Sequence, residues 1–226
     1  MVEKIPSPFN VEKIFASIQP LMEKYPAVHR APGLGGWAIQ STNGSYVDGW
    51  SKEYCPYNGP QNRSPHWNPS DPREKILRPI QDFILPTEFS CPELTSLVTQ
   101  LEDWGLNPRR ARIIKVLPGY EDHWHQDGVD RYYQARVHLP LYTNSDCAFV
   151  TKEGPYHMAA DNSFYFVHIN RPHTFYNRGT TNRYHFVCHI WDQKQFTQFH
   201  NYDASNFAGP SPRPKDFITD SVRPME

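Results

Sequence analysis

The chain has 226 residues, and its 23 Lys and Arg nearly balance its 24 Asp and Glu, giving a net charge of -1. A chain this close to neutral offers no basic field to phosphate backbones or anionic lipid, so we expect neither nucleic acid nor membrane as a partner. No apolar run approaches the ~20 residues of a spanning helix, and no hydrophobic signal core opens the sequence. The four cysteines form no CxxC pair, which favours a reduced, cytoplasmic protein.

Two segments in the first half of the chain have the apolar spacing of helices. Val11–Lys24 carries apolar residues on one face and follows Asn10, a favourable N-cap residue. Cys91–Trp104 has a similar face, with Ser90 placed to cap its start and Gly105 to end it. We expect both helices to pack on a sheet.

The stretch between these helices, residues 30–78, is rich in Gly, Pro, Asn and Ser and has few aliphatic runs. It predicts long loops with short strands such as Trp37–Ser41. Its aromatic residues argue against disorder, because disordered segments are poor in them. Two interpretations stay open: an ordinary coat of packed loops, and a lid over a substrate.

From Arg109 onward the pattern changes to short segments rich in β-branched and aromatic residues, separated by Gly, Pro, Asn and Asp. This pattern predicts a mainly β fold, an antiparallel sandwich or barrel of the jelly-roll kind. The length fits one well-buried core. We therefore expect a single domain over 1–226, with helices and loops at 1–108, the jelly-roll core at 109–191 and a Pro-rich extension at 192–226; the oligomeric state stays open. The predicted strands are RARIIKVL, ARVHLPLYT, CAFVT, SFYFVHI, HTFYN and RYHFVCHIW.

Alternation along two of these strands places polar residues together, because successive side chains in a strand point to opposite faces. One strand sets Arg136 and His138 opposite an apolar face, and another does the same with Arg183, His185 and His189. A solvent-facing sheet surface alternates in the same way, but such surfaces favour Lys, Glu, Thr and Ser. The pattern favours a polar face that lines the barrel, with the apolar face covered by the helices.

The triplet His125-Gln126-Asp127, followed by His173 and then Arg183, contains the residue types that hold non-haem iron. Two imidazoles and one carboxylate bind Fe(II) on one face and leave the other face open. His123 competes with His125, and Asp122 and Asp130 compete with Asp127. Only the pair His125 and Asp127 combines a histidine with a carboxylate two residues later.

Together with Arg136-Val137-His138-Leu139-Pro140-Leu141, these residues resemble the aspartyl/asparaginyl β-hydroxylase family of Fe(II)/2-oxoglutarate-dependent oxygenases, in particular its proline cis-4-hydroxylase-like members. The resemblance covers a little over a third of the chain. It implies a double-stranded β-helix, or jelly roll, with iron on His125, Asp127 and His173 as catalytic centre. Arg183 would then pair with the distal carboxylate of 2-oxoglutarate, a bidentate role that suits a guanidinium.

The same resemblance implies that Arg136 and His138 contact the cosubstrate or a second anionic group. It implies a reaction that uses O2, with ascorbate as a reductant in vitro. Asp127 favours hydroxylation, because related halogenases have a small residue in place of the carboxylate, and it also separates this chain from the animal enzymes that act on protein Asp and Asn. We expect a small polar substrate, such as a free amino acid. The alternatives are a protein or peptide hydroxylase, a cupin-type oxygenase or isomerase that uses iron without 2-oxoglutarate, and a non-catalytic cupin-type metal-binding jelly roll.

Overall fold

Strands dominate the part of the chain that the structure, a computed structural model, describes: residues 2–48, 52–54, 77–79, 82–125, 135–169 and 171–190. In chain order the elements are β1 (Val2–Pro6), α1 (Val11–Lys24), β2 (Val28–Ala31), β3 (Leu34–Ala38), β4 (Gln40–Ser41), β5 (Lys52–Tyr54), β6 (Leu77–Pro79), β7 (Leu85–Pro86), α3 (Pro92–Asp103), β8 (Pro108–Val116), β9 (Tyr120–Glu121), β10 (Ala135–Tyr142), β11 (Cys147–Thr151), β12 (Gly154–Tyr156), β13 (Ser163–His168), β14 (His173–Asn177) and β15 (Arg183–Ile190).

The strands from β8 onward pair in a nested pattern. β8 pairs with β15, β9 with β14, β10 with β13 and β11 with β12, all antiparallel. Further pairs join β10 to β15 and β11 to β14, so that the chain folds back on itself as two facing sheets. Two sheets built from eight antiparallel strands are the architecture of a jelly roll. The predicted double-stranded β-helix is therefore confirmed.

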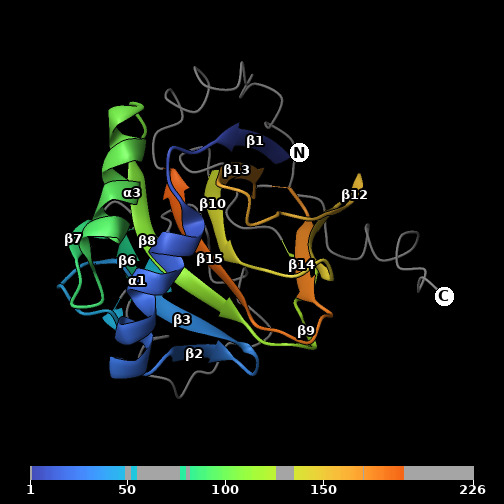
Figure 1. The fold of residues 1–226 in the computed structure, drawn as a ribbon, viewed down its shortest axis with the longest axis horizontal. Helices are drawn as coiled ribbons and strands as arrows, with labels where there is room; N and C mark the ends of the chain where they lie inside the picture. The colour runs from blue at the N-terminus through green and yellow to red at the C-terminus, as the bar shows by residue number, and fades with distance from the viewer. Residues whose placement is uncertain are drawn as a thin grey trace.

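Strands from the first third of the chain extend the larger of the two sheets. Its order is β1-β13-β10-β15-β8-β3-β2, whereas the smaller sheet has the order β12-β11-β14-β9. Figure 1 shows α1 and α3 on one side of the larger sheet, with β14, β9 and β12 on the other. The larger sheet thus has helices against one face and the smaller sheet against the other.

The first helix begins where the sequence predicts. The side chain of Asn10 accepts a hydrogen bond from the backbone N–H of Lys13, at 3.0 Å. This N-cap satisfies a donor that the first turn would otherwise leave without a partner. Val11, Ile14 and Ile18 are buried on the face turned toward the sheet.

The second helix starts one residue later than the predicted cap. Cys91, not Ser90, is the N-cap residue; its backbone is extended and its side chain makes no capping bond. Proline at the first helical position tolerates this start, because its missing N–H would have no intrahelical partner there. Gly105 ends the helix as predicted: its φ is +76°, and its N–H donates to the carbonyl of Glu102.

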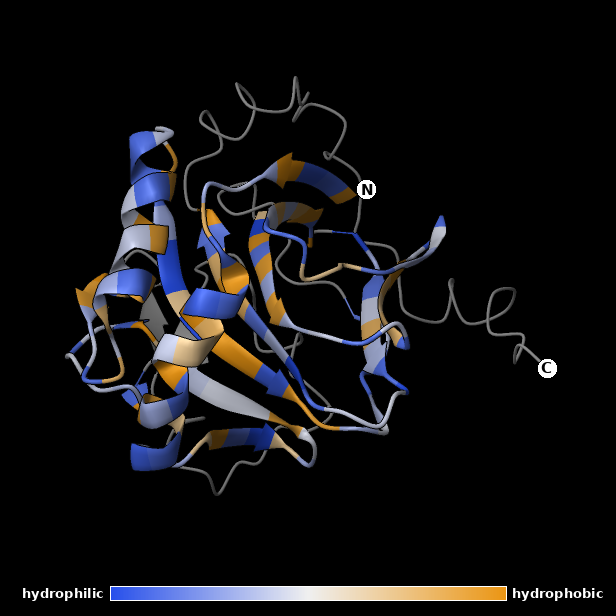
Figure 2. Cartoon of the chain, viewed as in Figure 1, coloured by the Kyte–Doolittle hydropathy of each residue, from blue (hydrophilic) through white to orange (hydrophobic). Residues whose placement is uncertain are grey.

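The apolar face of the larger sheet forms the main hydrophobic core with the two helices. Alternate residues of β10 and β15 point into this core, and Figure 2 shows the resulting alternation of hydrophobic and hydrophilic positions along these strands. Burial of aliphatic and aromatic side chains here supplies most of the favourable free energy of folding. The expected cover of this face by the two helices is confirmed. Core residues from the sheet include Val137, Leu139, Leu141, Phe164, Phe166, Phe186, Cys188 and Ile190, and those from the helices include Ile14, Ile18, Leu94, Leu97 and Leu101.

The opposite face of the larger sheet lies between the two sheets. A smaller apolar cluster fills part of this space, made of Phe149, Met158, Tyr165, Val167 and Ile169. The rest of the interior is polar, and it contains the arginines and histidines that the sequence places on one face.

His173 and Arg183 begin consecutive strands that lie in different sheets, because β14 belongs to the smaller sheet and β15 to the larger one. The five residues between these strands cross from one sheet to the other. The predicted strand at Trp37–Ser41 is divided: β3 ends at Ala38 and joins the larger sheet beside β8, while β4 pairs with β7.

The described residues contain no helix that is long and apolar enough to cross a membrane. The cysteines among them, Cys91, Cys147 and Cys188, are free thiols. Within the stretch 30–78, which the sequence allows as a coat of loops or a lid, residues 49–51 and 55–76 lie outside the described part of the chain, and so does the C-terminal extension at 192–226.

Candidate active site

The polar face of the larger sheet is buried inside the jelly roll. His138 of β10 is 7% exposed, and Arg183, His185 and His189 of β15 are 6%, 1% and 0% exposed. Arg136 sits opposite His189 in the register of β10 and β15. These side chains therefore line an interior space and not a solvent-facing surface.

This interior has a strongly positive wall. The strands β8, β10, β13 and β15 contain no Asp or Glu, yet they carry Arg112, Arg136 and Arg183 on or near the inner face. A buried guanidinium is costly without an anion or a set of hydrogen-bond acceptors. Arg183, which pairs with no carboxylate among the described residues, therefore suits an anionic ligand.

Two histidines from neighbouring segments meet at one end of the interior. His125 and His173 form an isolated antiparallel bridge in which each backbone N–H donates to the other's carbonyl, both at 2.9 Å. Directly paired residues of this kind carry their side chains on the same face. The two imidazole ring centroids are 4.5 Å apart.

The Nδ1 atoms of both rings face backbone carbonyls. Nδ1 of His125 lies 2.9 Å from the carbonyl oxygen of His123, and Nδ1 of His173 lies 2.7 Å from that of Arg171. A carbonyl oxygen only accepts, so each Nδ1 carries a proton, and in the neutral form of each ring the lone pair is on Nε2. Metal-binding histidines commonly donate their second nitrogen in this way, which fixes the ring and its tautomer. The donor set fits a divalent metal ion.

The predicted carboxylate ligand, Asp127, lies outside the described residues, as does its competitor Asp130. Within the described residues, Asp122, His123 and His125 offer donor atoms that all lie within 4.8 Å of one another. The Asp122 carboxylate accepts from the backbone N–H of His123 and lies 2.9 Å from its ring Nδ1. Asp122 and His123, two of the alternative ligands that the sequence offers, thus lie next to His125 in space.

Asp122 also connects the His125 segment to β14. Its backbone N–H donates to the carbonyl of Phe175, and its carbonyl accepts from the hydroxyl of Thr174 at 2.6 Å. Burial raises the pKa of the Asp122 carboxyl, but the hydrogen bond from His123 and the nearby rings of His125 and His123 outweigh it, so the pKa lies below its ordinary value. An ionised Asp122 therefore supports the loop that presents His125.

Arg183 lies deeper in the interior, across from β14. Its guanidinium carbon is 5.5 Å from the ring centroid of Phe175, and its Nε and Nη2 lie 3.0 and 2.9 Å from the two ring nitrogens of His185. Burial lowers its pKa to about 10, which leaves it charged at neutral pH. No carboxylate among the described residues pairs with it.

A small hollow adjoins this guanidinium. It is too narrow to hold a water molecule in this structure, and it is lined by Thr143, Cys147, Ala148, Phe149, Met158, Arg183 and His185. Phe149 also stacks on the imidazole of His173, with ring centroids 5.0 Å apart. One aromatic ring therefore borders both the hollow beside Arg183 and the histidine pair, which joins the two parts of the site.

The ring of His138 lies near Phe149 and His185, with centroid distances of 6.4 and 5.8 Å. Neither of its ring nitrogens has a hydrogen-bond partner in the described structure, although the side chain is buried. Burial, together with the charges of Arg183 and Arg136, holds its pKa well below 6.5, so the ring is neutral. A buried neutral imidazole with both nitrogens available suits contact with a polar ligand.

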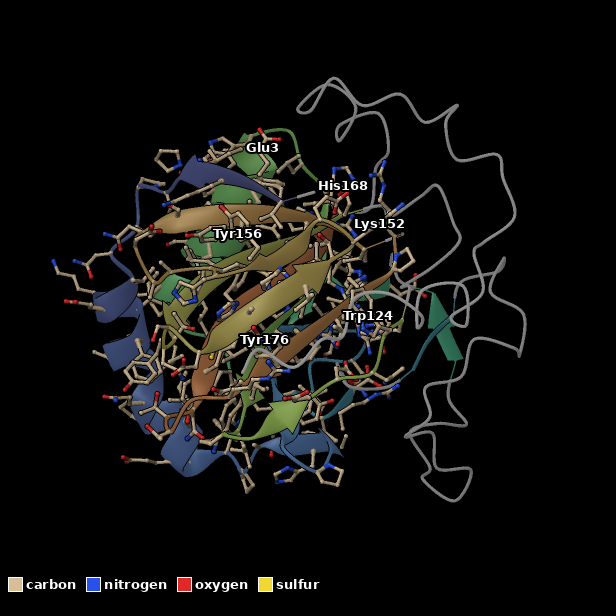
Figure 3. The ribbon with its side chains drawn as sticks, turned by 90° about the vertical axis from the view of Figure 1, so that its right-hand side faces the viewer. Glu3, Trp124, Lys152, Tyr156, His168 and Tyr176 are labelled. Atoms are coloured by element: carbon tan, nitrogen blue, oxygen red, sulfur yellow. The ribbon has the colours of Figure 1, made fainter. Side chains whose placement is uncertain are left out.

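The end of the jelly roll that holds the histidine pair is marked in Figure 3. Trp124, which precedes His125, lies toward the same side as Lys152, which follows β11, and His168, the last residue of β13. His173 pairs with the last residue of β11 in the strand register. The site thus lies where β11 and β13 end and β14 begins.

Sequence reasoning located five of the six predicted site residues in this one interior: His125, Arg136, His138, His173 and Arg183. It missed Phe149, and it placed His185 on the polar face without giving it a role as a ligand. The alternation of β11 could have signalled Phe149, because Cys147 and Phe149 share a face of that strand. The contact between His185 and Arg183 follows their spacing of two residues.

Comparison with known proteins adds independent findings. The model of the aspartyl/asparaginyl beta-hydroxylase family matches residues 77–193, slightly more than half of the chain. Comparison with curated proteins gives no match.

Several solved structures are similar in fold. An oxidoreductase of the 2OG-Fe(II) oxygenase family from Burkholderia pseudomallei is 13% identical with a TM-score of 0.51, and 84% of each chain is covered. A prolyl-4-hydroxylase from Pseudomonas putida is 9% identical with a TM-score of 0.46, covering 84% of this chain and 92% of the other. A prolyl hydroxylase from Trichoplax adhaerens, in complex with a peptide of hypoxia inducible factor, is 10% identical with a TM-score of 0.46 and coverage of 87% and 86%. At such identities the first likeness shows a shared fold and nothing finer.

The family implies Fe(II), 2-oxoglutarate and O2 as the reactants beside the substrate, and the described residues suit them. The Nε2 lone pairs of His125 and His173 suit a divalent metal ion, and the buried Arg183 suits an anion. The matched segment contains the whole jelly roll, including both histidines and the arginine. The chain belongs to the aspartyl/asparaginyl β-hydroxylase family and is a 2-oxoglutarate-dependent hydroxylase.

Proposed function

We propose that this enzyme hydroxylates a free amino acid or a similarly small polar metabolite, with His125, Asp127 and His173 as the iron ligands and Arg183 as the anchor of 2-oxoglutarate. The observation that carries the proposal is the pairing of His125 with His173, since both rings face backbone carbonyls with Nδ1 and keep the Nε2 lone pair for a metal. Asp127 would complete the set from a position two residues after His125.

The bound iron would supply the oxygen activation and hydrogen abstraction that no side chain can perform. The protein's own residues bind, orient and exclude water. Phe149 holds the imidazole of His173 by stacking, and the main-chain bridge to His125 fixes the second ring. Together they keep two metal ligands in place before the substrates arrive, which lowers the cost of organising the site.

Arg183 suits the distal carboxylate for reasons of charge and reach. Its guanidinium lies against Phe175, two residues along β14 from His173. At about 3.3 Å per residue this offset is about 7 Å along the strand, comparable to an extended five-carbon diacid. A 2-oxo acid bound to the metal by one end would therefore reach the guanidinium with the other.

Arg136 and His138 would face the opposite end of the cosubstrate or the substrate. Both lie on the inner face of β10, and His138 is neutral and buried. The neutral ring can donate one hydrogen bond and accept another, while Arg136 offers a cation to a carboxylate. An α-carboxylate is the group that distinguishes free amino acids from most residues within a peptide, so Arg136 favours a free amino acid.

Labelled 2-oxoglutarate tests the proposal directly. Purified protein with Fe(II), ascorbate as reductant and a panel of free amino acids should release succinate and carbon dioxide, and one panel member should raise turnover and gain one oxygen atom. His173→Ala should lose both iron and turnover, whereas His29→Gln, a substitution on the exposed face of β2, should change neither. Turnover only with peptides would contradict the proposed substrate class and leave the family assignment in place.

A further inference from the structure

The buried guanidinium of Arg183 is held by a single side chain of its own strand. Its Nε lies 3.0 Å from Nε2 of His185, and its Nη2 lies 2.9 Å from Nδ1 of the same ring. Both residues are almost fully buried, at 6% and 1% exposure. Among the described residues no hydrogen bond involves Nη1 of Arg183, so His185 engages one edge of the guanidinium.

The chemistry of this contact fixes the state of the ring. A guanidinium only donates hydrogen bonds, and an imidazolium has no acceptor, so the contact requires a neutral His185. Burial and the charge of Arg183 keep the pKa of His185 well below 6.5, in agreement with that requirement. The neutral ring of His185 has a single acceptor nitrogen, and this nitrogen faces the edge of the Arg183 guanidinium that carries Nε and Nη2.

The other contacts of the two residues restrict their movement. Phe175 of β14 covers the guanidinium from the facing sheet, at 5.5 Å. The ring of His138, on the neighbouring strand β10, meets that of His185 edge to face with centroids 5.8 Å apart. Arg183 and His185 both line the hollow beside Phe149. The guanidinium is thus confined between β14 and the imidazole, next to the space that borders His173.

We propose that His185 is a positioning residue that orients Arg183 by its Nε and Nη2 edge, so that the remaining N–H groups receive the distal carboxylate of 2-oxoglutarate. The proposal rests on the role of Arg183 proposed above. A long arginine side chain has many rotamers, and holding one of them in advance reduces the ordering cost of binding. His185 therefore determines the affinity for the cosubstrate without touching the reacting atoms.

Three substitutions of His185 separate positioning from packing. His185→Gln keeps an acceptor that can reach the guanidinium, whereas His185→Leu fills space without one. If His185→Leu does not fold, His185→Met replaces it, because its thioether fills the space with only a weak acceptor. Tyr184→Phe, on the opposite face of β15 where the Tyr184 hydroxyl contacts only Asn182 among the described residues, is the matched control.

The experiment measures binding of 2-oxoglutarate to the anaerobic Fe(II) protein by titration of the absorption band of the complex, and by calorimetry with Mn(II). We expect His185→Leu to weaken binding roughly tenfold, about the effect of one hydrogen bond to a charged group. His185→Gln should stay within about threefold of the wild type by the same reasoning, and Tyr184→Phe should be unchanged. The Leu variant should show this loss in the KM for 2-oxoglutarate, with kcat nearly constant.

Two outcomes would overturn the proposal. One is normal affinity in His185→Leu, whatever its unfolding free energy, because that would make the contact with Arg183 irrelevant to binding. The other is an equal loss in the Leu and Gln variants, which would indicate packing alone. Arg183→Lys distinguishes this failure from failure of the proposed function: if Arg183→Lys binds 2-oxoglutarate normally, Arg183 itself has been assigned wrongly.

Discussion

Replacing Arg183 with methionine should separate stability from function. The guanidinium is 6% exposed, and within the described structure its polar contacts are with the neutral imidazole of His185, which accepts one hydrogen bond. Burial lowers its pKa to about 10, below the ordinary value of a guanidinium, and a shift of that size corresponds to about 3 kcal/mol in favour of the uncharged form. The charge of Arg183 therefore destabilises the folded protein at neutral pH, where the group is protonated both folded and unfolded.

The expected change in unfolding free energy follows from two opposing terms. Removing the charge recovers about 3 kcal/mol, while His185 loses a donor and is left with a buried acceptor, which costs about 1–3 kcal/mol. Arg183→Met should therefore unfold with a free energy between unchanged and about 2 kcal/mol higher than the wild type. Guanidinium chloride unfolding of both proteins at pH 7 measures this difference.

The same substitution should remove most of the affinity for 2-oxoglutarate. A bidentate pair between a guanidinium and a carboxylate contributes at least about 3 kcal/mol when buried, and about 1.4 kcal/mol corresponds to a factor of ten. Calorimetry in the presence of Mn(II) should therefore show roughly 100-fold weaker binding. A variant that loses more than about 2 kcal/mol of stability yet binds 2-oxoglutarate normally would refute this reasoning, because Arg183 would then be a structural residue.

Three further substitutions and one pH series test other parts of the structure. His173→Ala should retain the fold but lose bound iron, which metal analysis of the purified protein measures; normal iron content would show that another residue is the third ligand. Thr174→Val removes the 2.6 Å hydrogen bond to Asp122 and should cost about 1 kcal/mol of stability, with weaker iron binding in a competition titration. Leu139→Ala, at a position with 0% exposure, should lower the unfolding free energy by about 2–5 kcal/mol without changing the KM for 2-oxoglutarate. The pKa values of His138 and His185 are lowered in the folded state, so near pH 6.5 only the unfolded chain takes up protons at these two residues. Below pH 6.5 the free energy of unfolding should therefore fall by up to about 1 kcal/mol per pH unit for each of the two histidines. Urea unfolding at pH 7.5 and 5.5 measures this fall, and His185→Gln should reduce the difference between the two pH values.

Local pattern was sufficient for the strands of the jelly roll. The segments CAFVT and HTFYN coincide with β11 and β14, and the predicted face of β10 with Arg136 and His138 points inward. These predictions depend on the two-residue period of a strand, which any sequence window reveals. The N-cap at Asn10 was equally local, since its side chain bonds three residues away.

Other features depend on contacts between distant parts of the chain. β1 is a short strand whose position follows from pairing with β13, more than 150 residues later. β9 and β12 have two and three residues, too few for a periodic signal, and they form only because β14 and β11 lie beside them. The sequence contains no local mark of such pairings, because the stabilising partner is supplied by the tertiary fold.

Between β14 and β15 the chain crosses from the smaller sheet to the larger one, and this crossing determines the distance between the histidine pair and Arg183. If these strands formed a hairpin, His173 and Arg183 would lie in one sheet, and their separation would depend on strand register alone. They belong to facing sheets instead, so the guanidinium reaches across the interior to Phe175, while Phe149 of the smaller sheet stacks on His173. Facing sheets pack about 10 Å apart, a distance that the hydrophobic cluster around Tyr165 and Val167 maintains. The space between the histidine pair and the arginine is therefore set by the packing of the two sheets, and a change in that packing should alter which 2-oxo acids fit before it alters the metal ligands.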